Sequence, residues 1–398
     1  MTQPGAGQEI EPARPSFFSQ RSRVTATRVL RPSVKVLPEH ARSHNRALVL
    51  QTLFTAGNQS RADVARSTGL TRVTVSELVT ELMAEGLLVE TGQRERARPG
   101  KPAILLDIAR SSFQIIAIDL SDHAVFRGAV LDLGGSILLR MELSLAGSTG
   151  QVALDHVSAL IESLVTQVSA PLLGIGVGCP GIVDLDGVVL SAPNLEWTGV
   201  PLQVWLSERF GVPVVVANDA NAAALAEHGF GGTTGDFMLV RIGRGVGSGL
   251  LLGDSPVYGS RFAAGEIGHV VVGTDGGELC RCGKRGCLET WVAVPRLEQK
   301  LADAPSGAAR EAILRDAGTR LGIALAPIVG ALNLGEVVLS GPTRLLADAF
   351  ESATLATIRG RTMAEFHGDL VLRMTSLGDD IVLRGAAVMV IFARLGVS

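Results

Sequence analysis

The spacing of apolar residues changes along the chain and separates three regions. Residues 1–40 contain five prolines and few periodic apolar positions, a composition that predicts a largely disordered extension. From His44 apolar residues recur at helical spacing as far as Ala56, where Gly57 and Asn58 break the pattern. We therefore expect a first folded domain over residues 41–109 and a larger one over 110–398.

Two more short helices are predicted after this break. Ser60 and Asp63 have the spacing of a capping box, which opens a helix that stops at Gly69, and Thr71 caps the next helix. That third helix carries one apolar stripe at positions i, i+3, i+4 and i+7. Its members are Val75, Leu78, Val79 and Leu82. The outward face is small and polar, and its candidate DNA contacts are Arg72, Thr74 and Ser76.

A two-stranded hairpin is predicted over residues 87–90 and 103–106, with a basic tip around Pro99 and Gly100. The basic residues of this tip are Arg94, Arg96, Arg98 and Lys101. Three helices followed by a basic hairpin predict a winged helix-turn-helix, whose third helix enters the major groove while Arg98 and Lys101 contact phosphate or the minor groove. A protein-binding winged helix is the alternative, and the clustered charge at the tip favours DNA.

Beyond residue 110, β-branched segments alternate with helical ones. Strands are expected at 114–119, 125–131, 137–143, 173–179, 213–217 and 237–242, and helices at 151–168, 200–209 and 219–229. Both consecutive strands and strand-helix alternation occur. This order predicts an α/β fold with a mixed sheet, arranged as two lobes with a cleft between them.

Composition and charge narrow the class of protein. Residues 1–110 hold 16 Lys and Arg against 10 Asp and Glu, whereas the remainder holds 20 against 29. A basic N-terminal region and an acidic remainder suggest that a nucleic-acid partner binds at the N-terminal end only. The chain shows neither a signal-peptide pattern nor an apolar run near twenty residues, so we expect a cytoplasmic protein without a membrane partner.

Three of the four cysteines, Cys280, Cys282 and Cys287, fall within eight positions beside a glycine-rich turn, and His269 precedes them. Zinc prefers four nitrogen and sulfur ligands in a tetrahedron, so this set predicts one structural zinc ion with no open coordination position. A reduced cysteine cluster without metal is the alternative. Cys179 ends an apolar strand without a basic neighbour, which predicts a buried, unreactive thiol.

These motifs carry a family resemblance. The segment Gly265–His269, with its pattern Glu-x-Gly-His, and the pattern Cys-x-Cys-Gly-x-x-Gly-Cys-x-Glu over residues 280–289 resemble the signature of the ROK proteins (repressors, open reading frames and kinases). The likeness covers residues 44–398. It implies an actin-like, ribonuclease H-like, two-lobed sugar-kinase fold that contains the zinc knuckle. In the repressor branch, which includes xylose and N-acetylglucosamine repressors, an N-terminal winged helix precedes it.

The resemblance also implies a sugar between the lobes. Its hydroxyls would be bonded by Asn218, Asp219, Glu266, His269 and Glu289, with Pro180, Gly181 and Asn194 lining the pocket. Carboxylates and amides suit vicinal hydroxyls, because charge-assisted hydrogen bonds discriminate epimers. His269 would use one ring nitrogen for zinc and the other for sugar. Taken alone, Asn218 and Asp219 after a strand are better explained as a helix cap.

The kinase branch of the family is the enzymatic alternative. There Asp219 would be the general base, and two glycine-rich turns would hold ATP phosphates. The second turn, residues 242–249, keeps its glycines, although such a run is often only a tight hairpin. The first turn, Asp-x-Gly-Gly-Thr in family kinases, reads Asp119 to His123 here, and the side chains of Ser121 and Asp122 would crowd and repel a phosphate.

We therefore expect a sugar-responsive transcriptional regulator, most simply a repressor of carbohydrate uptake or catabolism genes, rather than an ATP-dependent sugar kinase. Its expected partners are palindromic double-stranded operator DNA and a sugar or sugar phosphate effector. Pairing of two winged helices on a palindrome implies a homodimer or homotetramer.

Overall fold

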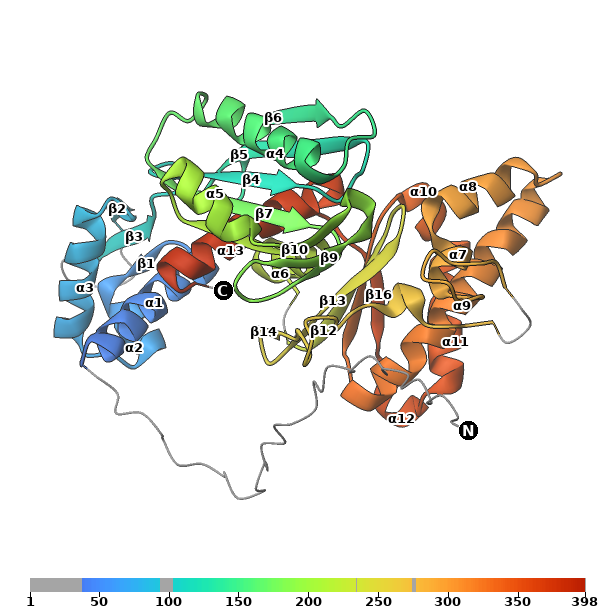
Figure 1. The fold of residues 1–398 in the computed structure, drawn as a ribbon. Helices are drawn as coiled ribbons and strands as arrows, with labels where there is room; N and C mark the ends of the chain where they lie inside the picture. Colours follow the sequence, from blue (N-terminus) through green and yellow to red (C-terminus); the bar gives the residue numbers. More distant parts are fainter. Residues whose placement is uncertain (1–37, 94–102, 234, 274–276, 398) are drawn as a thin grey trace, which may run out of the picture. The chain divides into compact units, whose positions relative to one another are not determined.

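The computed structural model describes residues 38–93, 103–233, 235–273 and 277–397 (Figure 1). The disorder expected over residues 1–40 falls almost entirely outside these ranges, and so do Arg98 and Lys101. The chain divides into residues 1–43 and a compact unit from His44 to Ser398, and every contact described below lies within that second unit. Among the described residues, no helix combines the length and apolar character needed to cross a membrane.

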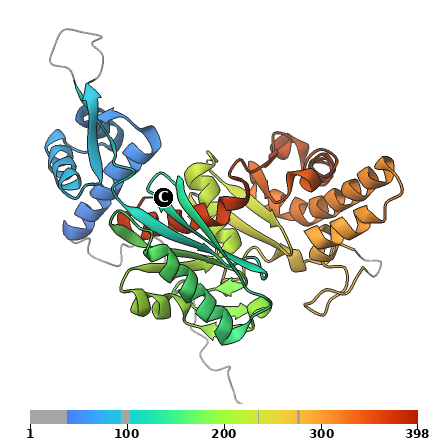
Figure 2. The same ribbon diagram turned by 90° about the horizontal axis from the view of Figure 1, so that it is seen from above.

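Three helices and three strands form the first domain. They are α1 (Pro38–Ala56), β1 (Gln59–Ser60), α2 (Arg61–Thr68), α3 (Arg72–Ala84), β2 (Leu88–Gln93) and β3 (Ile104–Ile108). The capping box of Ser60 with Asp63 and the Thr71 cap are both present. Two expectations need correction: α1 begins at Pro38 instead of His44, and the sheet has three strands because β1 pairs with β3. Figure 2 shows the helices of this domain in blue and its hairpin in cyan.

The apolar stripe of α3 forms the core of this domain. Its four members are buried, and they pack in one cluster with residues of α1 such as Val49, Leu50 and Leu53. The opposite face leaves Arg72 and Ser76 exposed, whereas Thr74 is half-buried. The helix therefore presents a polar face to solvent, as the pattern predicts.

The second domain contains two five-stranded sheets. The first belongs to what we call the N-lobe and has the order β11-β7-β4-β5-β6. Its strands are β4 (Gln114–Asp119), β5 (Val125–Asp132), β6 (Ile137–Ser144), β7 (Leu172–Cys179) and β11 (Val214–Asn218). A small sheet of β8 (Ile182–Val183), β9 (Val189–Ala192) and β10 (Trp197–Val200) packs with it, with η1 (Pro193–Leu195) between the last two.

Alternation along the N-lobe strands explains how both faces are covered. On β4, Ile116 and Ile118 pack with α4 (Gly150–Val165) and α5 (Leu202–Phe210). The intervening residues Ile115 and Ala117 belong to a different apolar cluster on the other face. Because side chains alternate between the faces of a strand, a continuous apolar run such as β4 predicts a sheet covered on both sides.

The second sheet belongs to the C-lobe and has the order β14-β13-β12-β15-β16. Its strands are β12 (Phe237–Ile242), β13 (Val246–Leu252), β14 (Ser255–Pro256), β15 (Glu336–Ser340) and β16 (Val371–Met374). The accompanying helices are α7 (Leu288–Val292), α8 (Val294–Ala302), α9 (Gly307–Leu332), α10 (Thr343–Leu346), α11 (Ala349–Arg361) and α12 (Ala364–His367). Met238, Val240 and Ile242 of β12 pack in one apolar cluster with α7, α8 and α9.

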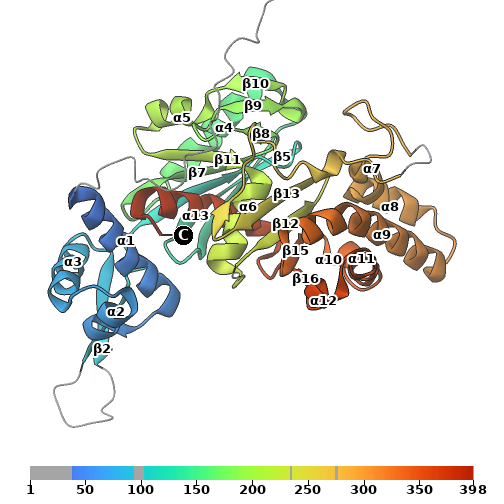
Figure 3. The same ribbon diagram turned by 90° about the horizontal axis from the view of Figure 1, so that it is seen from below.

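Two helices, α6 (Asp219–Phe230) and α13 (Ile381–Leu395), lie side by side between the sheets (Figure 3). Their contact is close because a Cβ atom on Gly385 of α13 would lie 1.8 Å from the carbonyl oxygen of Ala222. On the C-lobe side, a Cβ atom on Gly249 of β13 would lie 2.6 Å from the carbonyl oxygen of Ala220. Backbones this close leave no room for a larger residue.

The end of α13 also contributes to the core of the first domain. Leu395 and Val397 are buried in the same apolar cluster as Val49 and Leu50 of α1. A Cβ atom on Gly396, which has a φ of 71°, would lie 3.1 Å from the Cβ atom of Ala47. The last turn of the chain therefore packs against the winged helix.

A buried ionic network ties α6 to the C-lobe sheet. Glu227, near the end of α6, has a fully buried side chain. It accepts hydrogen bonds from Arg373 Nη2 at 2.6 Å and from the hydroxyl of Thr375 at 2.7 Å, while Arg373 of β16 also pairs with Glu336 of β15. Both carboxylates raise the pKa of Arg373 against the opposing effect of burial, so the pair stays charged.

We expect Glu227→Ala to lower the free energy of unfolding by about 3 to 5 kcal/mol, because it removes a fully buried carboxylate, leaves the partly buried Arg373 with one of its two carboxylate partners and opens a cavity. Urea denaturation would measure this loss. The matched control is Glu162→Ala, which breaks an exposed pair with Arg209 (Nη2 to Oε1, 2.7 Å) and should cost about 1 kcal/mol or less. Equal losses in the two variants would contradict a structural role for the network.

Candidate functional site

His269 and the three clustered cysteines come together as the sequence predicts. His269 ends the short helix η2 (Ile267–His269), and Cys287 lies just before α7. The four ligand atoms all lie within 4.8 Å of one another, with His269 Nδ1 3.5 Å from Cys280 Sγ and Cys282 Sγ 3.5 Å from Cys287 Sγ. A tetrahedron with metal-sulfur bonds of about 2.3 Å has edges of about 3.7 Å, so these residues fit one metal ion.

Backbone turns hold the cysteines in place. The amide of Cys280 donates to the carbonyl of Lys284 at 2.8 Å, and the amide of Gly283 donates to the carbonyl of Cys280 at 2.9 Å. Gly283 and Gly286 have φ angles of 86° and 76°, a region that glycine adopts at no steric cost. The glycines of the motif therefore shape the knuckle that presents the thiols.

The electrostatics of the cluster favour a bound cation. Burial and the neighbouring thiols of Cys282 and Cys280 raise the pKa of Cys287 to about 12. The pKa of Cys282 is lowered, chiefly by a hydrogen bond from the backbone of Lys284. Three thiolates in one cluster repel one another unless a positive ion lies among them, and a divalent metal supplies that charge.

The predicted sugar residues of the N-lobe lie where β11 meets α6. Asn218 caps α6, because its side-chain oxygen accepts from the amides of Ala220 and Asn221 at 2.9 and 3.0 Å. Its Nδ2 donates to the carbonyl of Gly181 at 2.8 Å. The cap interpretation is therefore confirmed, and these bonds occupy most of the hydrogen-bonding capacity of Asn218.

Asp219, the next residue, pairs with an arginine that sequence reasoning missed. Arg241 Nη1 of β12 donates to Asp219 Oδ2 at 2.9 Å, and both side chains are largely shielded from solvent. Burial raises the pKa of Asp219, Arg241 lowers it, and the nearby Asp119 raises it again. A charged residue at the next-to-last position of the otherwise apolar strand Phe237–Ile242 was the available signal.

The remaining predicted carboxylates gather around Asp219 and His269. The surrounding protein raises the pKa of Glu266, His269 lowers it, and Asp219 and Glu289 raise it further. Glu289 Oε2 accepts from the amide of Val246 at 3.2 Å, and its Oε1 lies 3.9 Å from Cys280 Sγ. The structure thus brings His269, Asp219 and Glu289 within electrostatic range of Glu266.

The second glycine-rich turn is a tight hairpin between β12 and β13. The amide of Gly243 donates to the carbonyl of Gly245 at 3.0 Å. A Cβ atom on Gly245 would lie 2.8 Å from Glu289 Oε2, just as Gly249 packs against α6. Close packing thus accounts for Gly249, which meets fixed backbone, whereas Gly245 faces the end of a flexible side chain.

The side chains of the first turn, after β4, form hydrogen bonds within the turn itself. Asp119 Oδ1 accepts from the amide of Ser121 at 2.9 Å and from its hydroxyl, and Asp122 Oδ1 accepts from the amide of Ala124 at 2.8 Å. Asp122 also lies 3.9 Å from Arg244 Nε of the hairpin turn.

Cys179, which ends the adjacent strand β7, is fully buried, and burial together with Asp219 raises its pKa well above the usual range.

Asn194 of η1 faces the metal knuckle. Its Oδ1 accepts from Arg281 Nη1 at 2.8 Å, and both side chains are exposed. Arg281 lies between Cys280 and Cys282, so the knuckle reaches the small sheet of the N-lobe. This contact places Asn194 near the other predicted sugar residues through a partner that was not predicted.

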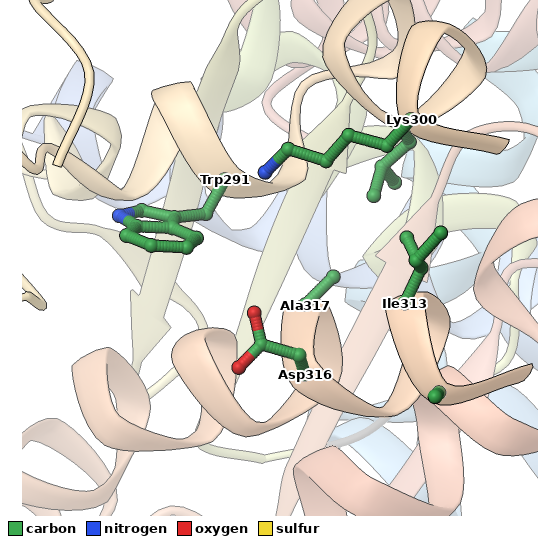
Figure 4. Close-up of a pocket in the computed structure, with 7 residues that line it drawn as sticks. Trp291, Lys300, Ile313, Asp316 and Ala317 are labelled. Atoms are coloured by element: carbon green, nitrogen blue, oxygen red, sulfur yellow. The ribbon is translucent and has the colours of Figure 1, made fainter. Parts of the chain in front are cut away.

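A separate cavity lies beyond α7, lined by Trp291, Lys300, Ile313, Asp316 and Ala317 among others (Figure 4). Its volume is about 270 Å³, and it contains none of the predicted sugar residues. Lys300 Nζ lies 4.8 Å from the Trp291 ring and Arg320 Cζ lies 4.1 Å from it. These cation–π contacts stabilise α7, the helix that carries Glu289.

Comparison with known proteins settles the family. The sequence profile of the ROK family matches residues 115–392. The chain belongs to the ROK family. It is similar to a putative xylose repressor from Caldicellulosiruptor sp. (strain Rt8B.4), with 30% identity over 87% of this chain and 95% of that protein.

Solved structures of ROK proteins confirm the fold. A ROK family transcriptional regulator, described as a homolog of the E. coli MLC protein, superimposes with a TM-score of 0.77 at 23% identity over 90% of this chain and 98% of its own. A ROK family glucokinase from Streptomyces griseus, in complex with glucose and AMPPNP, gives 0.57 at 25% identity over 69% and 98%. The chain therefore has the two-lobed, actin-like fold with an N-terminal winged helix-turn-helix.

We expect the purified chain to carry one divalent metal ion and Cys287→Ser to lose it, with a melting temperature lower by about 5 to 10 °C because a closed four-ligand site contributes folding energy. Elemental analysis and a thermal melt with and without chelator measure both. Cys179→Ala is the matched control, since Cys179 lies outside the cluster and this variant should keep its metal. A wild-type chain without metal after zinc-supplemented expression would contradict the site.

Proposed function

We propose that this chain is a sugar-responsive, DNA-binding transcriptional repressor of carbohydrate uptake or catabolism genes. The observation that carries the proposal is the presence, in one chain, of a winged helix with a polar recognition face and of the ROK sugar-site residues. The relative named as a putative xylose repressor aligns over 95% of its own length, so the likeness includes both parts. Such a regulator acts in the cytoplasm, where its operator lies.

The exposed face of α3 suits the major groove. Arg72 and Ser76 are exposed and offer hydrogen-bond donors to phosphates or base edges. Val73 is 68% exposed, and its apolar side chain suits contact with a thymine methyl group. Sequence reasoning missed it because it lies outside the apolar stripe of α3. Thr74 shares a hydrogen bond with the Thr71 cap at 2.9 Å. Arg98 and Lys101 would contact the backbone beside it.

The metal site and the sugar site share His269. His269 Nδ1 lies nearest Cys280 Sγ, so its Nε2 would be left for a sugar hydroxyl, and a fixed ring would present that nitrogen in one orientation. The proposed ion is Zn²⁺, which would stabilise the knuckle without an open position for catalysis. Sugar hydroxyls would be bonded by Asp219, Glu266 and Glu289, with Asn218, Gly181 and Asn194 at the edge.

The two turns that hold ATP phosphates in family kinases favour sugar sensing without phosphorylation in this chain. In the first turn, Ser121 and Asp122 carry side chains where a kinase needs open backbone amides, and the Asp122 carboxylate would repel a phosphate. In the second turn, Gly249 is required for packing against α6, and a Cβ atom at Gly245 would meet the end of the Glu289 side chain. These glycines therefore do not by themselves imply a nucleotide. A sugar bound between the lobes would favour one arrangement of the winged helices of a homodimer or homotetramer.

We expect one member of a sugar panel to raise the melting temperature of the full chain, because a ligand that binds only the folded state stabilises it by mass action. The panel contains D-xylose, D-glucose, N-acetylglucosamine and their phosphate esters. In a coupled assay with ATP, the same sugar should give no turnover above background. Asp219→Asn, with its metal retained, should lose the thermal shift. Robust phosphorylation, or no shift with any sugar, would contradict the proposal.

A further inference from the structure

Arg241 of β12 reaches from the C-lobe sheet to the residue that follows β11 of the N-lobe. Its neighbours on the strand, Val240 and Ile242, are fully buried, and they anchor the backbone from which the guanidinium extends. The side chains of Arg241 and Asp219 are only 25% and 14% exposed. An ion pair shielded to this degree is far less weakened by salt than a surface pair.

The acceptor sites of Asp219 are largely occupied. Oδ1 accepts from the amide of Ala220 at 2.9 Å and from Asn218 Nδ2 at 3.2 Å, and Oδ2 accepts from Arg241 Nη1 at 2.9 Å. An ionised carboxylate offers about four lone-pair positions. The Ser121 hydroxyl also bonds the Asp219 carboxyl and lowers its pKa. A single sugar hydroxyl would therefore compete with Ser121 for the remaining position.

The titratable groups around Asp219 come from four elements. Arg241 faces it from β12, Asp119 from β4, Cys179 from β7 and Glu266 from the loop before η2. Burial and Asp119 raise the pKa of Asp219, and Arg241 is the cation that opposes them. The guanidinium therefore favours the charged form of this carboxyl at a crowded, acidic position.

We propose that Arg241 is a positioning residue of the sugar site, which favours the ionised form of Asp219 and orients it as an acceptor for one sugar hydroxyl. This inference rests on the proposed function and assigns a role to a residue outside the ROK motifs described above.

Arg281 orients the side-chain amide of Asn194 through a hydrogen bond, as Arg241 orients the carboxylate of Asp219. A guanidinium has donors only, so the Asn194 oxygen must face Arg281 and its amide nitrogen must point elsewhere. Asn194 would then act toward a sugar as a donor, whereas Asp219 acts as an acceptor. Two arginines of the C-lobe thereby set the hydrogen-bond polarity of two N-lobe residues, which is a basis for discriminating between sugars.

The first test compares thermal stability between about pH 5 and pH 8 for Arg241→Gln, Arg241→Lys and Asp219→Asn, singly and combined. Burial raises the folded pKa of Asp219 above its unfolded value, so ionisation of this carboxyl destabilises the fold as pH rises through the folded pKa. Arg241 offsets that cost. The stability lost in Arg241→Gln should therefore grow toward pH 8, less so in Arg241→Lys, and the pH dependence should vanish with Asp219→Asn present.

Arg209→Gln is the matched control, because it breaks an exposed arginine pair and should show no such pH trend. A loss in Arg241→Gln that is equal at pH 5 and pH 8, or that persists in the Asp219→Asn background, would overturn the charge-holding role and leave Arg241 as a packing residue.

The second test measures sugar affinity by calorimetry, using the panel member that shifts the wild-type melting temperature. Arg241→Gln should bind it about tenfold more weakly at pH 8 than wild type, with partial recovery at Arg241→Lys. Unchanged affinity in Arg241→Gln would overturn the positioning role while leaving the proposed function standing. If no sugar binds the wild type, the proposed function fails, and the stability comparison still decides whether Arg241 holds the charge of Asp219.

Discussion

Helix α6 is held at both ends by arginines of the C-lobe sheet, and this constraint fixes the geometry of the site. Asp219 at its start pairs with Arg241 of β12, and Glu227 near its end pairs with Arg373 of β16. Between these ends the helix approaches its neighbours at glycine, most closely at Gly385 of α13. A helix clamped in this way cannot shift without moving the sheet or α13, because packed interiors are not continuously deformable.

The same constraint suggests a route by which sugar binding affects the DNA-binding domain. Asp219 begins α6, α6 packs along α13, and the end of α13 places Leu395 and Val397 in the apolar core that contains Val49 and Leu50 of α1. These contacts form a continuous chain of packed residues. Contact alone does not make a pathway, since coupling also requires that the sugar bind one arrangement of the lobes better than another. The metal knuckle adds a second link across the lobes where Arg281 meets Asn194.

Local rules predicted the features that depend on neighbouring residues. The capping box at Ser60, the stripe on α3 and the ligand set around Cys280 follow from spacing alone, and the structure confirms the first two and brings the third together. Long-range pairing was beyond such rules: Arg241 and Asp219 lie on different elements, and only the fold brings them together. The glycine run was ambiguous because the same residues serve phosphate binding or close packing, and the contact of Gly249 with α6 supplies the packing reason. Strand β1 was missed because two residues carry no periodic signal.

The central claim is that sugar binding and DNA binding are coupled in one chain, and reciprocal titration tests it most directly. Operator fragments selected from genomic DNA would be titrated with the full chain in the presence and absence of the sugar that stabilises it, and the sugar would be titrated into free and DNA-bound protein. The account predicts that sugar weakens DNA binding by a factor of about 5 to 150 and that DNA weakens sugar binding by the same factor. Sugar and DNA that bind the chain with affinities independent of each other would contradict it.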